Sequence, residues 1–232
     1  MDEKARRFYA KVEKYGGWKR VPADRIHDLA NEIIEPAKIG FVKAHRGFLV
    51  RKISEDISHA IKLDALKGAS YGISCGVWLP FVPFPYAPQL RWHRSLKSAE
   101  LTLRNQPQEW LQERQCPQRP DHGFTADSML GEQCFREEFG KAWRSASVRV
   151  QKWFAETVTL ESVLSRCDEQ SNRQNSGICF VPEPGLVRAL TLARMGRIAK
   201  ANEELESFLE QSNTESDARA NLRRALGQIV PG

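Results

Sequence analysis

The chain has 232 residues, of which 41% are hydrophobic and 28% charged, and its formal net charge is +6. This balance is that of a globular protein and excludes a fibrous or disordered chain. No apolar run approaches the roughly 20 residues of a membrane-spanning helix, and the segment MDEKARRFYAKVEKY lacks the apolar stretch of a secretory signal. The five cysteines are odd in number and never in CxxC spacing, so neither a disulfide framework nor a zinc ribbon is expected. We therefore expect a cytoplasmic protein with no membrane contact.

The positive charge is concentrated in the first half of the chain. Residues 1–124 contain 21 lysines and arginines against 14 acidic residues, whereas residues 125–232 contain 14 against 15. The change falls in the segment 115–123 (QCPQRPDHG), where two prolines and a glycine are typical of a connection between structured sections. The pattern predicts two sections, a basic one over 1–124 and a second over 125–232.

The basic section begins with two predicted helices. Apolar residues recur at helical spacing over 2–15 and again over 23–38, where Pro22 suits the first turn and Pro36 kinks or ends the helix. Apolar and polar residues then alternate, which predicts strands at 48–53, 60–64, 70–82 and 100–104. Because the early links are short, we predict an α+β fold, with an antiparallel four-stranded meander and flanking helices followed by an all-helical section.

A proline-rich segment separates the last two predicted strands. Residues 79–94 (LPFVPFPYAPQLRWHR) set four prolines among aromatic and basic side chains, which excludes regular structure and favours an extended backbone. Either the segment is tucked onto the sheet and its rings fill the core, or it is a stiff binding loop whose Trp, Tyr and Arg side chains anchor a partner. The candidate partner-binding residues are Phe84, Tyr86, Arg91, Trp92, His93 and Arg94.

Residues 125–232 are predicted to be helical, with helices over 128–156, from 160 onward and over 218–230. The most regular pattern, over 186–211, resembles the helix–turn–helix core of one tetratricopeptide repeat, in which Gly196 permits the turn and small residues let the helices approach. Since stacked repeats need about three units for stability, we expect a helical hairpin packed on a domain rather than a peptide-binding solenoid.

A motif of glycines, aromatic residues and strand hydrophobes extends over about 22–83. It comprises Gly40-Phe-Val-Lys43, Phe48, Arg51, Asp56, Ile61, Leu63, Ser70-Tyr-Gly-Ile73 and Gly76-Val77. In these residues the segment resembles a bacterial domain-of-unknown-function family of the DUF4304 type. The resemblance implies an α+β fold and a bacterial source, and it carries over no catalytic residue. Small domains of this sort resemble those found beside toxins and in phage-defence loci.

No motif of recognised chemistry is present in the sequence. The histidines are scattered without HxxxH or HExxH spacing, and no glycine-rich phosphate loop links a strand to a helix. We therefore expect no catalytic residue, no cofactor and no metal ion. The arrangement nearest to a nuclease site is Glu55, Asp56, Asp64 and Lys67 around a predicted hairpin, which gives a Mg²⁺-dependent nuclease as one alternative.

The basic residues support nucleic-acid binding as another alternative. Lysines and arginines crowd the first 25 residues, and a candidate basic face follows on a predicted hairpin, formed by Lys43, Arg46, Arg51 and Lys52. Backbone phosphates would be the natural partner of such a face.

The leading hypothesis is a non-enzymatic bacterial binding protein, an immunity or defence-system accessory that occludes a partner protein. It rests on the missing catalytic motif, the segregated charge and the aromatic proline-rich segment. The expected partner is a protein with an acidic surface, and the nucleic-acid binder and the nuclease are the alternatives.

Overall fold

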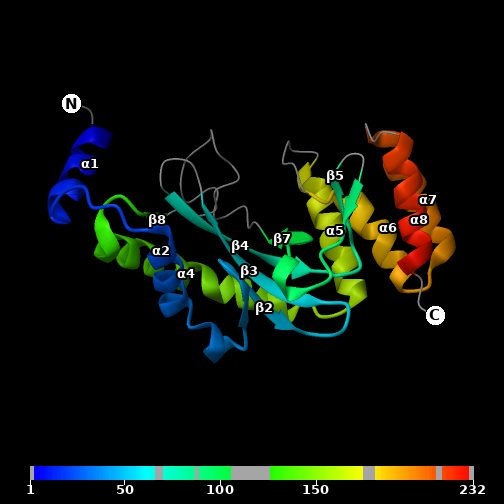
Figure 1. The fold of residues 1–232 in the computed structure, drawn as a ribbon, viewed down its shortest axis with the longest axis horizontal. Coiled ribbons are helices and arrows are strands. Elements are labelled where there is room, and N and C mark those ends of the chain that lie inside the picture. The colour runs from blue at the N-terminus through cyan, green and yellow to red at the C-terminus, as the bar shows by residue number, and fades with distance from the viewer. Residues whose placement is uncertain are drawn as a thin grey trace. The chain divides into compact units, whose positions relative to one another are not determined.

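The computed structural model describes residues 3–65, 70–86, 89–105, 126–174, 181–212 and 216–229 (Figure 1). The fold is α+β, as predicted, with an antiparallel sheet in the N-terminal part and helices in the C-terminal part. The helices are α1 (Glu3–Lys14), α2 (Ala23–Ile34), η1 (Pro36–Ile39), η2 (Leu96–Ser98), α4 (Gly131–Ala155), α5 (Leu160–Gln174), α6 (Pro184–Arg194), α7 (Ile198–Gln211) and α8 (Ser216–Ile229). The strands are β1 (Val42–His45), β2 (Phe48–Lys52), β3 (Ser58–Ala65), β4 (Ser70–Trp78), β5 (Phe84–Tyr86), β6 (Gln89–Arg91), β7 (Leu103–Asn105) and β8 (Ala126–Asp127).

Helix α2 ends just before Pro36, as the sequence predicts. Glu35 follows the helix in a left-handed backbone conformation with φ of 51°, and its N–H donates to the carbonyl of Asn31 at 2.9 Å. Pro36 then opens η1, a single turn of tighter helix. A proline has no N–H for the α-helical ladder, so the helix cannot continue through this position.

The main sheet has the strand order β1-β2-β3-β4-β7, and β8 pairs with the first residues of β4. The four predicted strands correspond to β2, β3, β4 and β7, although β4 ends at Trp78 and β7 begins only at Leu103. Strands β1 and β8 are additional. Strand β7 runs antiparallel to β4, with Gly76 opposite Arg104. A Cβ atom on Gly76 would lie 1.9 Å from the carbonyl oxygen of Leu103, so only glycine fits this approach of two backbones.

The chain divides into two compact units. Unit 1 comprises Met1–Leu49, Ile61–Ser74 and Gln106–Gln151, and unit 2 comprises Val50–Ala60, Cys75–Asn105 and Lys152–Gly232. Strands β2, β3 and β4 and helix α4 contribute residues to both units. The predicted connection at 115–123 lies outside the described residues, so the division at 124/125 stays a prediction.

In unit 1, α1 is held against α4 by polar side chains. Glu137 accepts hydrogen bonds from Lys14 at 2.8 Å and from the Tyr15 hydroxyl at 2.6 Å, and Lys11 pairs with Glu138. Deeper in the unit, Phe135 and Phe139 of α4 are fully buried and stack with their ring centres 5.2 Å apart. The basic helix is therefore partly neutralised by acidic residues of α4.

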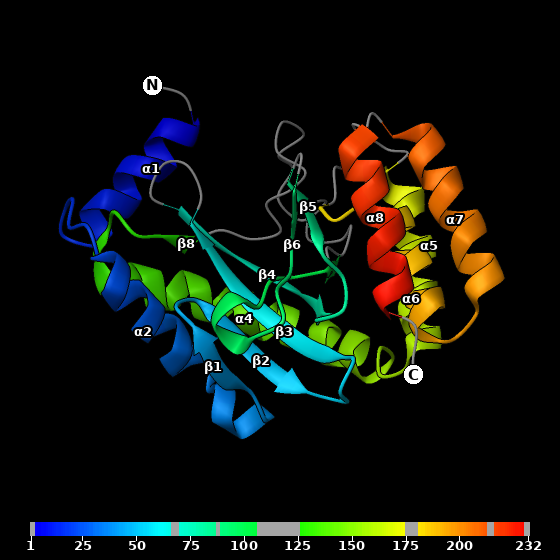
Figure 2. The same cartoon turned by 45° about the vertical axis from the view of Figure 1, so that its right-hand side comes forward.

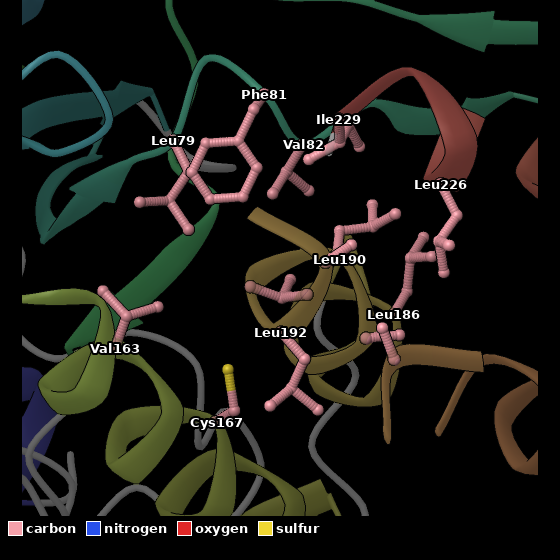
Figure 3. Close-up of a cluster of buried hydrophobic side chains, with 14 of the residues drawn as sticks. Leu79, Phe81, Val82, Val163, Cys167, Leu186, Leu190, Leu192, Leu226 and Ile229 are labelled. Carbon is pink, nitrogen blue, oxygen red and sulfur yellow. The ribbon is translucent and has the colours of Figure 1, made fainter. Parts of the chain in front are cut away.

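Unit 2 contains a large apolar cluster (Figure 3). The segment after β4 contributes Leu79, Phe81 and Val82 to this cluster. These side chains lie beside α6 and α8 and pack against the leucine side chains of those two helices. The predicted helix–turn–helix over 186–211 is confirmed as α6 and α7, with Gly196 in the turn at φ of 76° and Ala201 fully buried. The C-terminal helices of this unit thus share one core with the segment that leads into β5.

Candidate functional site

The proline-rich segment forms a short antiparallel hairpin, so the prediction that it lacks regular structure is wrong at its centre. Strands β5 and β6 pair with Phe84 opposite Arg91 and Tyr86 opposite Gln89. The two strands form a sheet of their own. Prolines are tolerated here because each strand has an outer edge, where a missing N–H breaks no ladder bond.

The base of the hairpin is anchored in unit 2. Phe84 is only 3% exposed and meets the ring of His93 edge-on at 4.7 Å between centres. The Trp78 indole donates to the carbonyl of His93 at 2.6 Å, and the imidazole Nδ1 bonds to the carbonyl of Ser98. Because a carbonyl only accepts, Nδ1 carries the hydrogen and Nε2 is left as an acceptor. Phe84 and His93 therefore hold the hairpin in place rather than face a partner.

Aromatic rings and guanidinium groups are stacked on the outer part of the hairpin. The guanidinium of Arg91 lies 4.7 Å from the centre of the Tyr86 ring, and that of Arg94 lies 3.9 Å from the Trp92 ring. Tyr86 is 48% exposed, whereas Trp92 is partly buried against the apolar cluster. Such stacking orders both arginines in advance of binding. Phe84 thus fills the core, as the first interpretation of the proline-rich segment expects, while Tyr86 is exposed and the binding interpretation stays a prediction.

A groove of about 340 Å³ runs between β6 and α8. We call it the β6–α8 groove, and it is lined by Gln89, Leu90, Trp92, Asn221, Arg224, Ala225 and Gln228. The α8 residues recur at helical spacing, so they form one stripe along the helix. Figure 2 shows the hairpin beside α8, in agreement with the packing of β6 on that helix. Its lining combines the apolar side chains of Leu90, Trp92 and Ala225 with three carboxamide side chains and the guanidinium of Arg224.

The arginines around this groove lack acidic partners within the described part of the chain. Arg91 and Arg94 have only their ring contacts, and Arg224 has a long contact of 3.4 Å with the side-chain oxygen of Asn221. Elsewhere in unit 2 arginines are paired, as Arg194 is with Asp56 and Arg223 with Glu206. The charge at the groove is therefore available to an anionic ligand.

Arg51 of the predicted basic face is half-buried and contacts buried side chains. Its guanidinium donates to Nδ1 of His59 at 3.0 Å and lies 5.6 Å from the centre of the Phe154 ring. His59 is 1% exposed and donates from Nε2 to the carbonyl of Thr157 at 2.7 Å. Burial, followed by the nearby charge of Arg51, lowers the pKa of His59 to about 4, although the Thr157 hydrogen bond opposes the shift. This arrangement joins β2, β3 and the end of α4 as a packing element.

Two of the three remaining residues of that face are paired with carboxylates. Arg46 pairs with Asp24 at 2.7 Å and Lys52 with Glu55 at 2.6 Å, while Lys43 is exposed. Lys43 and Arg46 belong to unit 1 and Arg51 and Lys52 to unit 2. Paired cations release less free energy on binding phosphates, because a carboxylate must first be displaced.

The carboxylates proposed for a nuclease site each have a partner of their own. Asp56 accepts from Arg194 at 2.8 Å, Glu55 from Lys52, and Asp64 from the Ser74 hydroxyl at 2.6 Å. Lys67 lies outside the described residues. Within the part of the chain that the structure describes, no three His, Cys, Asp or Glu side chains gather closely enough to hold a metal ion.

Sequence reasoning missed the α8 side of the groove. The sequence does contain a pattern that could have indicated it. The buried face of α8 carries Leu222, Leu226 and Ile229, and a polar stripe beside that face carries Asn221, Arg224 and Gln228. Nothing in the local pattern shows that this second stripe meets β6.

Comparison of the chain with protein-family models, with curated protein sequences and with solved structures gives no match. The resemblance over residues 22–83 therefore stays a prediction. Among the described residues, no helix combines the length and the apolar character that crossing a membrane requires.

Proposed function

We propose that this protein is a non-enzymatic binding protein that holds an acidic segment of a partner protein in the β6–α8 groove. The observation that carries the proposal is a set of three arginines that have no carboxylate partner in the described part of the chain. Arg224 lines the groove, Arg94 stacks on its lining residue Trp92, and Arg91 belongs to β6, the strand that borders it. An acidic segment with one or two apolar side chains complements such a surface in charge and in shape.

Each part of the surface has a physical role in binding. Trp92 and Leu90 are partly buried against the unit 2 cluster, so a ligand that covers them gains apolar contact with little loss of side-chain freedom. The arginines steer an acidic partner toward the groove and then fix its orientation through charge-assisted hydrogen bonds. The hairpin is preorganised by the burial of Phe84 and the bond from Trp78 to His93.

A protein of this kind acts by occlusion, since a partner surface held in the groove is withheld from any other ligand. We propose bacterial defence or toxin neutralisation as the setting, which is what the resemblance over residues 22–83 implies. The alternative of nucleic-acid binding is weakened because Lys11, Lys14 and Arg25, three of the N-terminal cations, are paired with glutamates of α4.

Charge reversal at the groove tests this function. The double variant Arg91→Glu/Arg224→Glu is compared with Lys200→Glu, a reversal at an exposed α7 residue that does not line the groove. A protein partner is first captured from extracts of the source cells, identified by mass spectrometry and purified, and its Kd is then measured by titration calorimetry. We expect the double variant to raise Kd by about tenfold or more, because repulsion replaces attraction at two contacts.

The control Lys200→Glu is expected to bind within about twofold of the wild type. Equal affinity of the wild type and the double variant would show that the partner does not use the groove. A captured ligand that proves to be DNA or RNA would favour the nucleic-acid alternative.

A further inference from the structure

Among the described residues, the outer edge of β6 offers both a backbone donor and a backbone acceptor at its central residue, whereas the outer edge of β5 has no donor at Pro85. The hairpin is a two-stranded sheet, so each strand has one unpaired side. The central residue of β5 is Pro85, which has no N–H, and it lies opposite Leu90. Because Pro85 cannot donate to Leu90, these two residues form the non-hydrogen-bonded pair of the ladder. The N–H and C=O of Leu90 therefore point away from β5.

The free edge of β6 coincides with the groove. Gln89, Leu90 and Trp92 line the groove, and none of the three β5 residues does so. No bond to the backbone of Leu90 from beyond the hairpin occurs among the described residues. A backbone donor and acceptor beside a groove that offers both apolar and polar side chains are the elements of a site for strand addition.

We propose that the acidic segment binds in an extended conformation and adds as a third strand to the free edge of β6. This inference rests on the proposed function and specifies the conformation of the partner. Main-chain bonds to Leu90 fix the register of the segment. Alternate acidic side chains of the added strand reach Arg91 and Arg224, because side chains of a strand repeat on one face every second residue.

The carboxamide groups of the groove complete this recognition. Gln89, Asn221 and Gln228 line the groove around Leu90, and each carries both a donor and an acceptor. The backbone of an extended peptide presents donors and acceptors in alternation, which such side chains match. A helical segment has its N–H and C=O groups paired internally and cannot use the edge of β6.

Backbone methylation of a peptide tests strand addition. The probe is a fluorescein-labelled heptapeptide of alternating valine and glutamate, titrated with the wild-type chain by fluorescence anisotropy. Two further peptides carry N-methyl groups on all odd or on all even residues. An extended strand directs alternate N–H groups to opposite edges, so methylation of one set blocks the bonds to β6 and methylation of the other set does not.

We expect the unmodified peptide to bind and one methylated peptide to bind at least tenfold more weakly than the other. If both methylated peptides bind like the parent while Arg91→Glu/Arg224→Glu weakens all three, the proposed function stands and strand addition is overturned. If none of the peptides binds, both are overturned. Competition by a twelve-residue oligothymidine for the same groove would instead assign the site to nucleic acid.

Discussion

His59 is the most enclosed histidine among the described residues of unit 2. Its imidazole is bonded on both nitrogens, by Arg51 and by the carbonyl of Thr157, and one face of the ring stacks on Phe154 with the centres 4.5 Å apart. Burial is the main cause of its lowered pKa, and the charge of Arg51 acts in the same direction. A buried neutral histidine of this kind makes folding sensitive to acid.

We predict that His59 lowers the free energy of unfolding as the pH falls from about 6.5 to about 4. The folded pKa lies below the ordinary value, so the unfolded chain takes up a proton that the folded chain does not, and the loss reaches about 2.5 kcal/mol at pH 4.5. Urea unfolding of the wild type and of His59→Gln at both pH values measures this loss in the free energy of unfolding. The wild type should be the more stable at pH 7, and the difference should shrink by about that amount at pH 4.5. Parallel pH curves would contradict this role.

Gly76 is a second residue whose replacement has a defined outcome. In Gly76→Ala the new methyl group meets the backbone of Leu103, which belongs to the neighbouring strand and cannot rotate away. We expect a loss of about 3 kcal/mol or more in the free energy of unfolding. Gly227→Ala is the matched control, because nothing lies near the added methyl group and alanine favours the helix, with an expected gain of about 0.5–1 kcal/mol. Similar stabilities of the two variants would refute the close strand approach.

At the scale of elements, the sequence predicted the helices and strands whose boundaries are set by neighbouring residues. Helix α2 ends just before Pro36, Gly196 lies in the turn between α6 and α7, and apolar and polar residues alternate along β4. Strand β1 escaped prediction because it has only four residues, all exposed or half-buried, so its short alternation marks no buried face. The hairpin escaped because four prolines obscured a pairing that depends on the anchoring of Phe84 in the core.

The candidate site was predictable only in part for a similar reason. Tyr86, Arg91, Trp92 and Arg94 were found by residue type, since aromatic and basic side chains stand out in a proline-rich segment. Arg224 was not, because it lies more than a hundred residues further along and meets β6 only in the folded unit. Arg51 was assigned to a basic face because its buried partner His59 belongs to another strand.

At the scale of the whole molecule, part of the positive charge of the first half is paired with acidic residues of the second half. Residues 1–124 carry the excess, yet α4, from the second half, supplies Glu132, Glu137 and Glu138 as partners for cations of α1 and α2. Arginines without acidic partners occur at the β6–α8 groove of unit 2, namely Arg91, Arg94 and Arg224. The proposed binding surface therefore rests on where unpaired charge lies among the described residues and not on the total charge.

A hydrogen-exchange footprint of the complex with the purified protein partner tests the central claim most directly. Amide exchange is measured for the free chain and for the chain saturated with partner. We predict slower exchange at residues 89–92 and along the groove side of α8, with residues 3–34 unchanged, because the partner contacts the β6–α8 groove and orders its edge strand. Protection across residues 3–34 with none at residues 89–92 would contradict the account and place the partner on the basic N-terminal helices.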